Sequence, residues 1–163
     1  MILIALGANL PFAAATPEQT LHASLTLLSN NGAKVISVSR FFMTPAWPDP
    51  SDPSYVNAVA MVASSLTPGA IMGLMHDIES RLGRVRGKPN APRCLDLDLL
   101  DYEGKTEAGP PILPHPRIEN RGFVLIPLAD IAPGWVHPVS GRSVGELIGK
   151  LSGAEQDAIR PLR

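Results

Sequence analysis

The sequence predicts an α+β fold in which an antiparallel sheet carries helices on one face. Three observations lead to this prediction. Four β-prone runs alternate with two segments whose apolar residues recur at helical spacing. Each helical segment opens with a Thr-Pro pair, which joins an N-cap to the residue that best suits the first helical position. The resulting order of elements is β-α-β-β-α-β.

The first four elements lie in the first 63 residues. Residues 1–6 form an apolar strand, and Thr-Pro-Glu-Gln at 16–19 forms a capping box that begins a helix. Residues 34–42 are rich in Val, Ile, Ser and Phe and predict the second strand. A proline-rich loop at 44–53 separates this strand from the third strand, predicted at 55–63.

The last two elements repeat the same signals. Thr67-Pro68 begins a helix that Gly83 closes, and a basic loop follows at 84–93. Residues 95–99 read Leu-Asp-Leu-Asp-Leu, and this strict alternation is typical of a strand with one buried face.

The remaining segment, residues 103–163, is a C-terminal extension with helices predicted at 121–131 and 143–151. The βαββαβ order that precedes it is the split βαβ, or ferredoxin-like, pattern. Because no repeat, low-complexity tract or linker interrupts the chain, we expect a single domain over residues 1–163.

Composition narrows the function classes. A formal net charge of −1 gives no overall attraction to nucleic acid or to an anionic membrane. The apolar start lacks a basic leader and cleavage pattern, and no apolar run reaches the ~20 residues that span a bilayer. Cys94 is the only cysteine, so no internal disulfide forms. We therefore expect a cytoplasmic protein with no nucleic-acid or membrane partner.

Asp96 and Asp98 are the strongest chemical signal. Side chains alternate along a strand, so both carboxylates project from one face, roughly 6–7 Å apart. Two carboxylates this close repel each other, and a divalent cation removes the conflict. Oxygen ligands of this kind, completed by water and phosphate, suit Mg²⁺. The competing interpretation is a solvated acidic strand face.

Basic residues just before the acid pair favour phosphate chemistry. They are Arg81, Arg84, Arg86, Lys88 and Arg93. An acid pair beside arginines is what magnesium-nucleotide transfer needs, because the metal bridges phosphate oxygens while guanidinium groups balance developing charge. A solvated basic loop remains the alternative, and Glu79 reads as a solvated helix residue.

A second constellation can bind a flat heterocycle, because amides match ring donors and acceptors and aromatic faces sandwich a ring. Taken singly, each member has a plainer interpretation as a core aromatic, a loop residue or a surface cation. The members are the Thr44-Pro45-Ala46-Trp47 loop, Tyr55, Asn57, His115, Arg121 and Phe123.

Taken together, these segments resemble the 6-hydroxymethyl-7,8-dihydropterin pyrophosphokinases of folate synthesis. The matching blocks are G-R-V-R at 83–86, P-R-C-L-D-L-D-L at 92–99 and L-P-H-P-R-I-E-N-R-G-F at 113–123. The start I-A-L-G-A-N-L also matches, and the resemblance spans residues 1 to about 135.

The resemblance implies a ferredoxin-like fold and a role for each matching residue. Asp96 and Asp98 would bind two Mg²⁺ ions, while Arg84 and Arg93 would be catalytic and would engage the triphosphate of ATP. The other expected contacts are His115 and Arg121 with ATP, and Thr44, Pro45, Ala46, Tyr55, Asn57 and Phe123 with the pterin.

The implied reaction moves diphosphate from ATP to the hydroxymethyl group of the pterin and releases AMP, with ATP and hydroxymethyldihydropterin as the partners of a monomeric enzyme. One segment departs from the family: residues 87–93 form a short loop without the aromatic that many members carry. Two rival hypotheses remain, a non-catalytic RNA-binding module and an inactive relative that binds only pterin.

Overall fold

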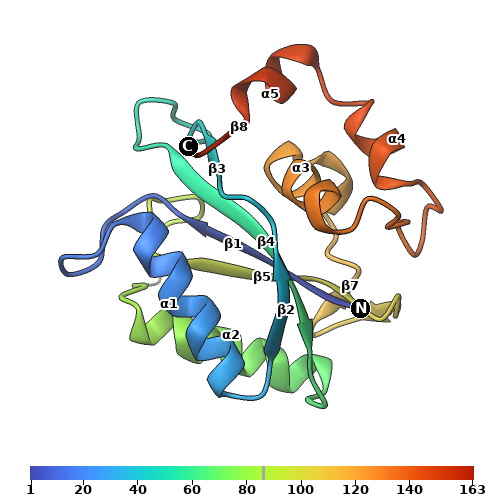
Figure 1. Cartoon of the computed structure of the whole chain (residues 1–163), viewed down its shortest axis with the longest axis horizontal. Helices are drawn as coiled ribbons and strands as arrows, with labels where there is room; N and C mark the ends of the chain where they lie inside the picture. Colours follow the sequence, from blue (N-terminus) through green and yellow to red (C-terminus); the bar gives the residue numbers. More distant parts are fainter. Residues whose placement is uncertain (86) are drawn as a thin grey trace.

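A six-stranded antiparallel sheet forms the centre of the molecule (Figure 1). The computed structural model describes residues 1–85 and 87–163; Arg86, one of the predicted basic residues, lies outside the described part. The strand order is β5-β1-β4-β3-β8, and β2 also pairs with β4. The strands are β1 (Ile2–Ala8), β2 (Lys34–Val38), β3 (Phe42–Thr44), β4 (Tyr55–Ala63), β5 (Asp96–Tyr102) and β8 (Arg160–Pro161).

The two helices of the predicted βαββαβ unit, α1 (Pro17–Asn30) and α2 (Pro68–Arg81), cover one face of the sheet (Figure 1). Both expected N-caps are present: the Thr16 hydroxyl accepts from the amide of Gln19, and the Thr67 hydroxyl from that of Ala70. Their apolar stripes pack on alternate residues of β1, β4 and β5 in one continuous core. The predicted fold class is confirmed.

The predicted second strand, residues 34–42, is instead two short strands, β2 and β3. The break lies at Ser39, whose hydroxyl oxygen accepts a hydrogen bond from the backbone amide of Val59 at 3.0 Å. A side chain thus takes the place of a main-chain acceptor, and the register shifts between Val35 and Ser37.

The extension contributes a small hairpin and a second helical layer. The hairpin strands are β6 (Glu107–Ala108) and β7 (Ile112–Leu113), followed by a 3₁₀ turn at Ile118–Asn120, α3 (Gly122–Ile131), α4 (Val144–Ile148) and α5 (Gly153–Ala158). The predicted helices at 121–131 and 143–151 are confirmed, the second in shorter form. The sequence pattern predicted neither α5 nor β8.

Helices α3 and α4 pack on the sheet face opposite α1 and α2. Leu3, Val59 and Leu100 form the sheet side of this second core. The strand register places Asp96 opposite Gly7 and Gly7 opposite Asn57, so these positions share the α3 face. No helix within the described residues is long and apolar enough to cross a membrane.

Candidate active site

Asp96 and Asp98 face a cavity of about 810 Å³ between the sheet and α3. We call it the central cavity. It collects segments that are far apart in the sequence, from Ala5 on β1 to Ile159 after α5. Eleven of the twelve predicted site residues line it: Thr44, Pro45, Ala46, Tyr55, Asn57, Arg84, Arg93, Asp96, Asp98, Arg121 and Phe123.

The two carboxylates are neutralised by arginines. Arg84 Nη1 donates to Asp96 Oδ1 at 2.7 Å, and Arg93 Nη1 lies 3.4 Å from Asp96 Oδ2. Arg121 Nη1 donates to Asp98 Oδ2 at 3.0 Å. The repulsion expected between the acids is therefore offset within the chain, and the same guanidinium groups lie where phosphate oxygens could replace the carboxylates as partners.

Glu79 is not the solvated helix residue that its position, taken singly, predicted. It is only 2% exposed, rather than solvated. Its Oε1 atom accepts from the backbone amide of Leu97 at 2.7 Å and from Arg84 Nη1, so it ties α2 to β5 between the two acids. Burial raises the pKa of Glu79, against the opposing effect of these hydrogen bonds. Its position toward the end of the apolar stripe of α2 was the available signal.

Aromatic and amide groups also line the central cavity, beside the acids and arginines. Asn57 Nδ2 donates to the Thr44 hydroxyl at 2.7 Å, which fixes the amide at the floor of the cavity. Tyr55 and Phe123 are partly exposed, and Trp47 is 72% exposed at the rim. Burial raises the pKa of Tyr55, so its hydroxyl stays protonated. These three aromatics, of which Phe123 carries the Arg121 guanidinium 5.6 Å from its ring centroid, and the fixed amide suit a flat, hydrogen-bonding ring.

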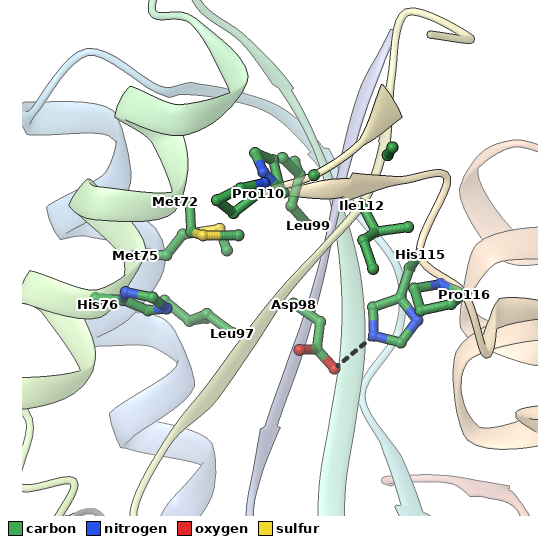
Figure 2. A pocket seen from close by; sticks show the side chains of 13 residues that line it. Met72, Met75, His76, Leu97, Asp98, Leu99, Pro110, Ile112, His115 and Pro116 are labelled. Carbon is green, nitrogen blue, oxygen red and sulfur yellow. Dashed lines mark ion pairs between the residues drawn. The ribbon is translucent and has the colours of Figure 1, made fainter. Parts of the chain in front are cut away.

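A second hollow of about 590 Å³ lies along the outer strand β5; we call it the edge cavity. Figure 2 shows Met72, Met75 and His76 of α2 on one side and the 110–116 segment on the other. Asp98 lines both cavities. Sequence reasoning missed this apolar hollow, although Met72, Met75 and His76 recur at helical spacing and so signal a shared face.

His115, the twelfth predicted residue, lies where the cavities meet. Its Nδ1 accepts from the backbone amide of Arg117 at 3.1 Å, which aims Nε2 at Asp98 Oδ2, 3.8 Å away (Figure 2). Burial lowers the pKa of His115 despite the neighbouring Asp98 carboxylate, which acts in the opposite direction. A neutral imidazole next to an acid can orient that acid or a phosphate oxygen.

The acid pair fits a hard cation whose shell is shared with a substrate. Both carboxylates are about one-third exposed; both line the central cavity, and Asp98 also lines the edge cavity. Within the described residues, no group of three or more His, Cys, Asp or Glu side chains is close enough to hold a metal ion. Two carboxylates leave most of an octahedral shell to water and phosphate oxygens, which is the usual arrangement for Mg²⁺ with a nucleotide.

Comparison with known proteins identifies the family. The sequence model of 7,8-dihydro-6-hydroxymethylpterin-pyrophosphokinase (HPPK) matches residues 3–133. The 2-amino-4-hydroxy-6-hydroxymethyldihydropteridine pyrophosphokinase of Methylorubrum extorquens is 38% identical over 80% of this chain and 83% of its own length. The enzyme of the same name from Haemophilus influenzae is 33% identical over 97% of both chains.

Solved structures agree on the fold. The Plasmodium falciparum HPPK-DHPS crystal structure superposes on 91% of this chain with a TM-score of 0.72 at 14% identity. This chain corresponds to 44% of that longer protein. Taken with the matched residues and the two cavities that meet at Asp98, these comparisons show that the chain belongs to the 7,8-dihydro-6-hydroxymethylpterin-pyrophosphokinase family, the pyrophosphokinases of folate biosynthesis.

Proposed function

We propose that Asp96 and Asp98 hold two Mg²⁺ ions between ATP in the edge cavity and hydroxymethyldihydropterin in the central cavity. One observation carries this assignment: Asp98 lines both cavities, so a group bound to it contacts the occupants of both. A diphosphate transfer needs such a meeting point, because donor and acceptor atoms must lie in line and close together.

The edge cavity suits the adenosine of ATP. Met72 and Met75 present polarisable, adaptable side chains to one face of a base, and Ile112 of the hairpin presents an apolar side chain to the other. A base seated there would direct its triphosphate along β5 toward Asp98. His115 and Arg121, both within 4 Å of Asp98, would then contact the phosphates.

The central cavity suits the pterin. Tyr55 and Phe123 offer ring faces, while the Asn57 amide and the backbone of Thr44, Pro45 and Ala46 offer donors and acceptors to the ring edge. Seated in this way, the ring would point its hydroxymethyl group toward the acid pair.

The hydroxymethyl oxygen attacks the β-phosphorus of ATP in line, and AMP leaves. Bound magnesium supplies charge neutralisation of the triphosphate. When cations occupy Asp96 and Asp98, Arg84, Arg93 and Arg121 exchange their carboxylate partners for phosphate oxygens. The protein forms no covalent bond, so its contribution is positioning and electrostatic stabilisation. No side chain is assigned as the general base.

Residues 1–163 act as one domain in this proposal, as a cytoplasmic monomer whose partners are the two small substrates. Two cores that share the same sheet support a single folding unit. A net charge of −1 supports the absence of a nucleic-acid or membrane partner.

Product analysis tests the assignment directly. AMP should form only when the chain, ATP, Mg²⁺ and hydroxymethyldihydropterin are all present, and EDTA should abolish it. Formation of ADP in place of AMP would contradict diphosphate transfer. Pterin binding without AMP release would favour a relative that binds substrate only, and single-stranded RNA binding without either would favour the module hypothesis.

A further inference from the structure

We infer that the C-terminal strap, residues 153–161, forms a wall of the central cavity and limits which ring substituents fit there. The strap comprises α5 and β8 and lies outside residues 3–133, the part that the family model matches. The inference rests on the proposed binding of pterin in this cavity.

The strap lines the cavity with three side chains. Glu155, Ala158 and Ile159 all border it. Ala158 is exposed, whereas Ile159 is 8% exposed and fixed by packing. A methyl group at Ala158 leaves room beside the ring that a larger side chain would fill, so the size of this residue sets the width of the cavity on this side.

Backbone pairing joins the strap to the loop on one side of the cavity. β8 pairs antiparallel with β3, with Phe42 opposite Pro161 and Met43 opposite Arg160. The Leu162 amide donates to the Phe41 carbonyl at 2.7 Å. β3 ends at Thr44, so this pairing holds the start of the loop that is expected to contact the pterin.

Close packing joins the strap to α3 on the other side. Glu155 Oε1 accepts from the Gly122 amide at 3.3 Å. A Cβ atom at Gly122 would lie 2.8 Å from that oxygen and 2.9 Å from Ile159 Cδ1, so a larger residue here would have to displace the ends of both strap side chains. Gly122 lies between Arg121 and Phe123. One short segment therefore fixes both the ring-contacting loop and the aromatic that faces it.

Adding bulk at Ala158 tests the wall. We compare Ala158→Phe with Asp157→Phe, which adds the same ring at a neighbouring exposed position that does not line the cavity. Calorimetry measures hydroxymethyldihydropterin binding with Mg²⁺ and α,β-methylene-ATP present, and binding of that analogue alone. Ala158→Phe should weaken pterin binding at least about tenfold while analogue binding stays within about twofold. Asp157→Phe should change neither.

Ile159→Ala tests separately whether packing of the strap against α3 supports pterin binding. Circular dichroism is the check on folding. The substitution should weaken pterin binding by a few-fold, again without an effect on the analogue. Unchanged pterin binding by Ala158→Phe would contradict the inference that the strap limits the central cavity. An equal loss of pterin and analogue binding would also contradict it. If the unmodified chain binds the analogue but no pterin, the proposed function fails instead.

Discussion

The two cavities differ in how far apart in the sequence their lining residues are. The edge cavity is built by residues between Met72 and Pro116, mostly from α2, β5 and the adjoining hairpin. The central cavity draws on residues from Ala5 to Ile159 and combines strands, loops and α3. Methionine and proline side chains can hold a base through shape alone, whereas the heterocycle needs hydrogen-bonding groups at fixed positions. In the proposed assignment, recognition of the acceptor therefore depends more on the complete tertiary fold than binding of the base does.

Substitution of Asp98, which lines both cavities, or of Asp96 should have the largest effect on activity. Asp96→Asn and Asp98→Asn each remove the charge of a proposed metal ligand and should lower the rate of AMP release by about 100-fold or more. Both carboxylates are partly exposed, so circular dichroism should show an intact fold. Asp157→Asn is the matched control. Near-normal turnover in both variants would refute the metal assignment.

Phe123→Ala should affect the central cavity alone. Phe123 is 38% exposed, so the loss removes a ring contact without opening the core. We expect the KM for pterin to rise about tenfold and the KM for ATP to stay within about twofold. Val139→Ala, at a 65% exposed position elsewhere, serves as the control. An equal rise in both KM values would remove the distinction between the cavities.

Met72→Ala should give the opposite selectivity with a smaller effect. Its side chain faces the edge cavity from α2, and the loss of part of an apolar contact should raise the KM for ATP about three- to fivefold. The KM for pterin should stay constant. Ile36→Ala, at a 56% exposed position on β2, is the comparison. A change in the pterin KM alone would place the base elsewhere.

Glu79 tests the contribution of the contact between α2 and β5 to stability. Glu79→Ala leaves the buried Leu97 amide without its acceptor and should lower the free energy of unfolding by about 1–3 kcal/mol, whereas Glu79→Gln should cost less. Urea denaturation measures both.

The difference in the free energy of unfolding between the unmodified chain and Glu79→Gln should change with pH in a defined direction. Burial raises the pKa of Glu79, so its contribution to stability is fully present below the unfolded value of about 4.3 and is lost as pH rises through the folded pKa. The gap between the unmodified chain and Glu79→Gln should therefore narrow from pH 4 to pH 8. A gap that widens would contradict this.

Local signals in the sequence predicted the elements well. The Thr16 and Thr67 caps, the leucine stripe of α1 and the alternation around Asp96 each act within a few residues, and each is present in the structure. The break at Ser39 was not predicted, because a serine among β-branched residues is compatible with a continuous strand. The break depends on a hydrogen bond from the amide of Val59, 20 residues away, to the Ser39 hydroxyl oxygen.

The sequence by itself determined the βαββαβ order, the shared face of the two acids and, through its motifs, the family. These follow from capping, from periodicity and from motif spacing, all of which are local. Only the tertiary structure decided that Glu79 is buried, that three arginines neutralise the acid pair, that a second cavity opens along β5 and that the C-terminal strap lines the central cavity. Each of these depends on which distant segments meet once the chain is packed, and spacing along the sequence does not encode such meetings.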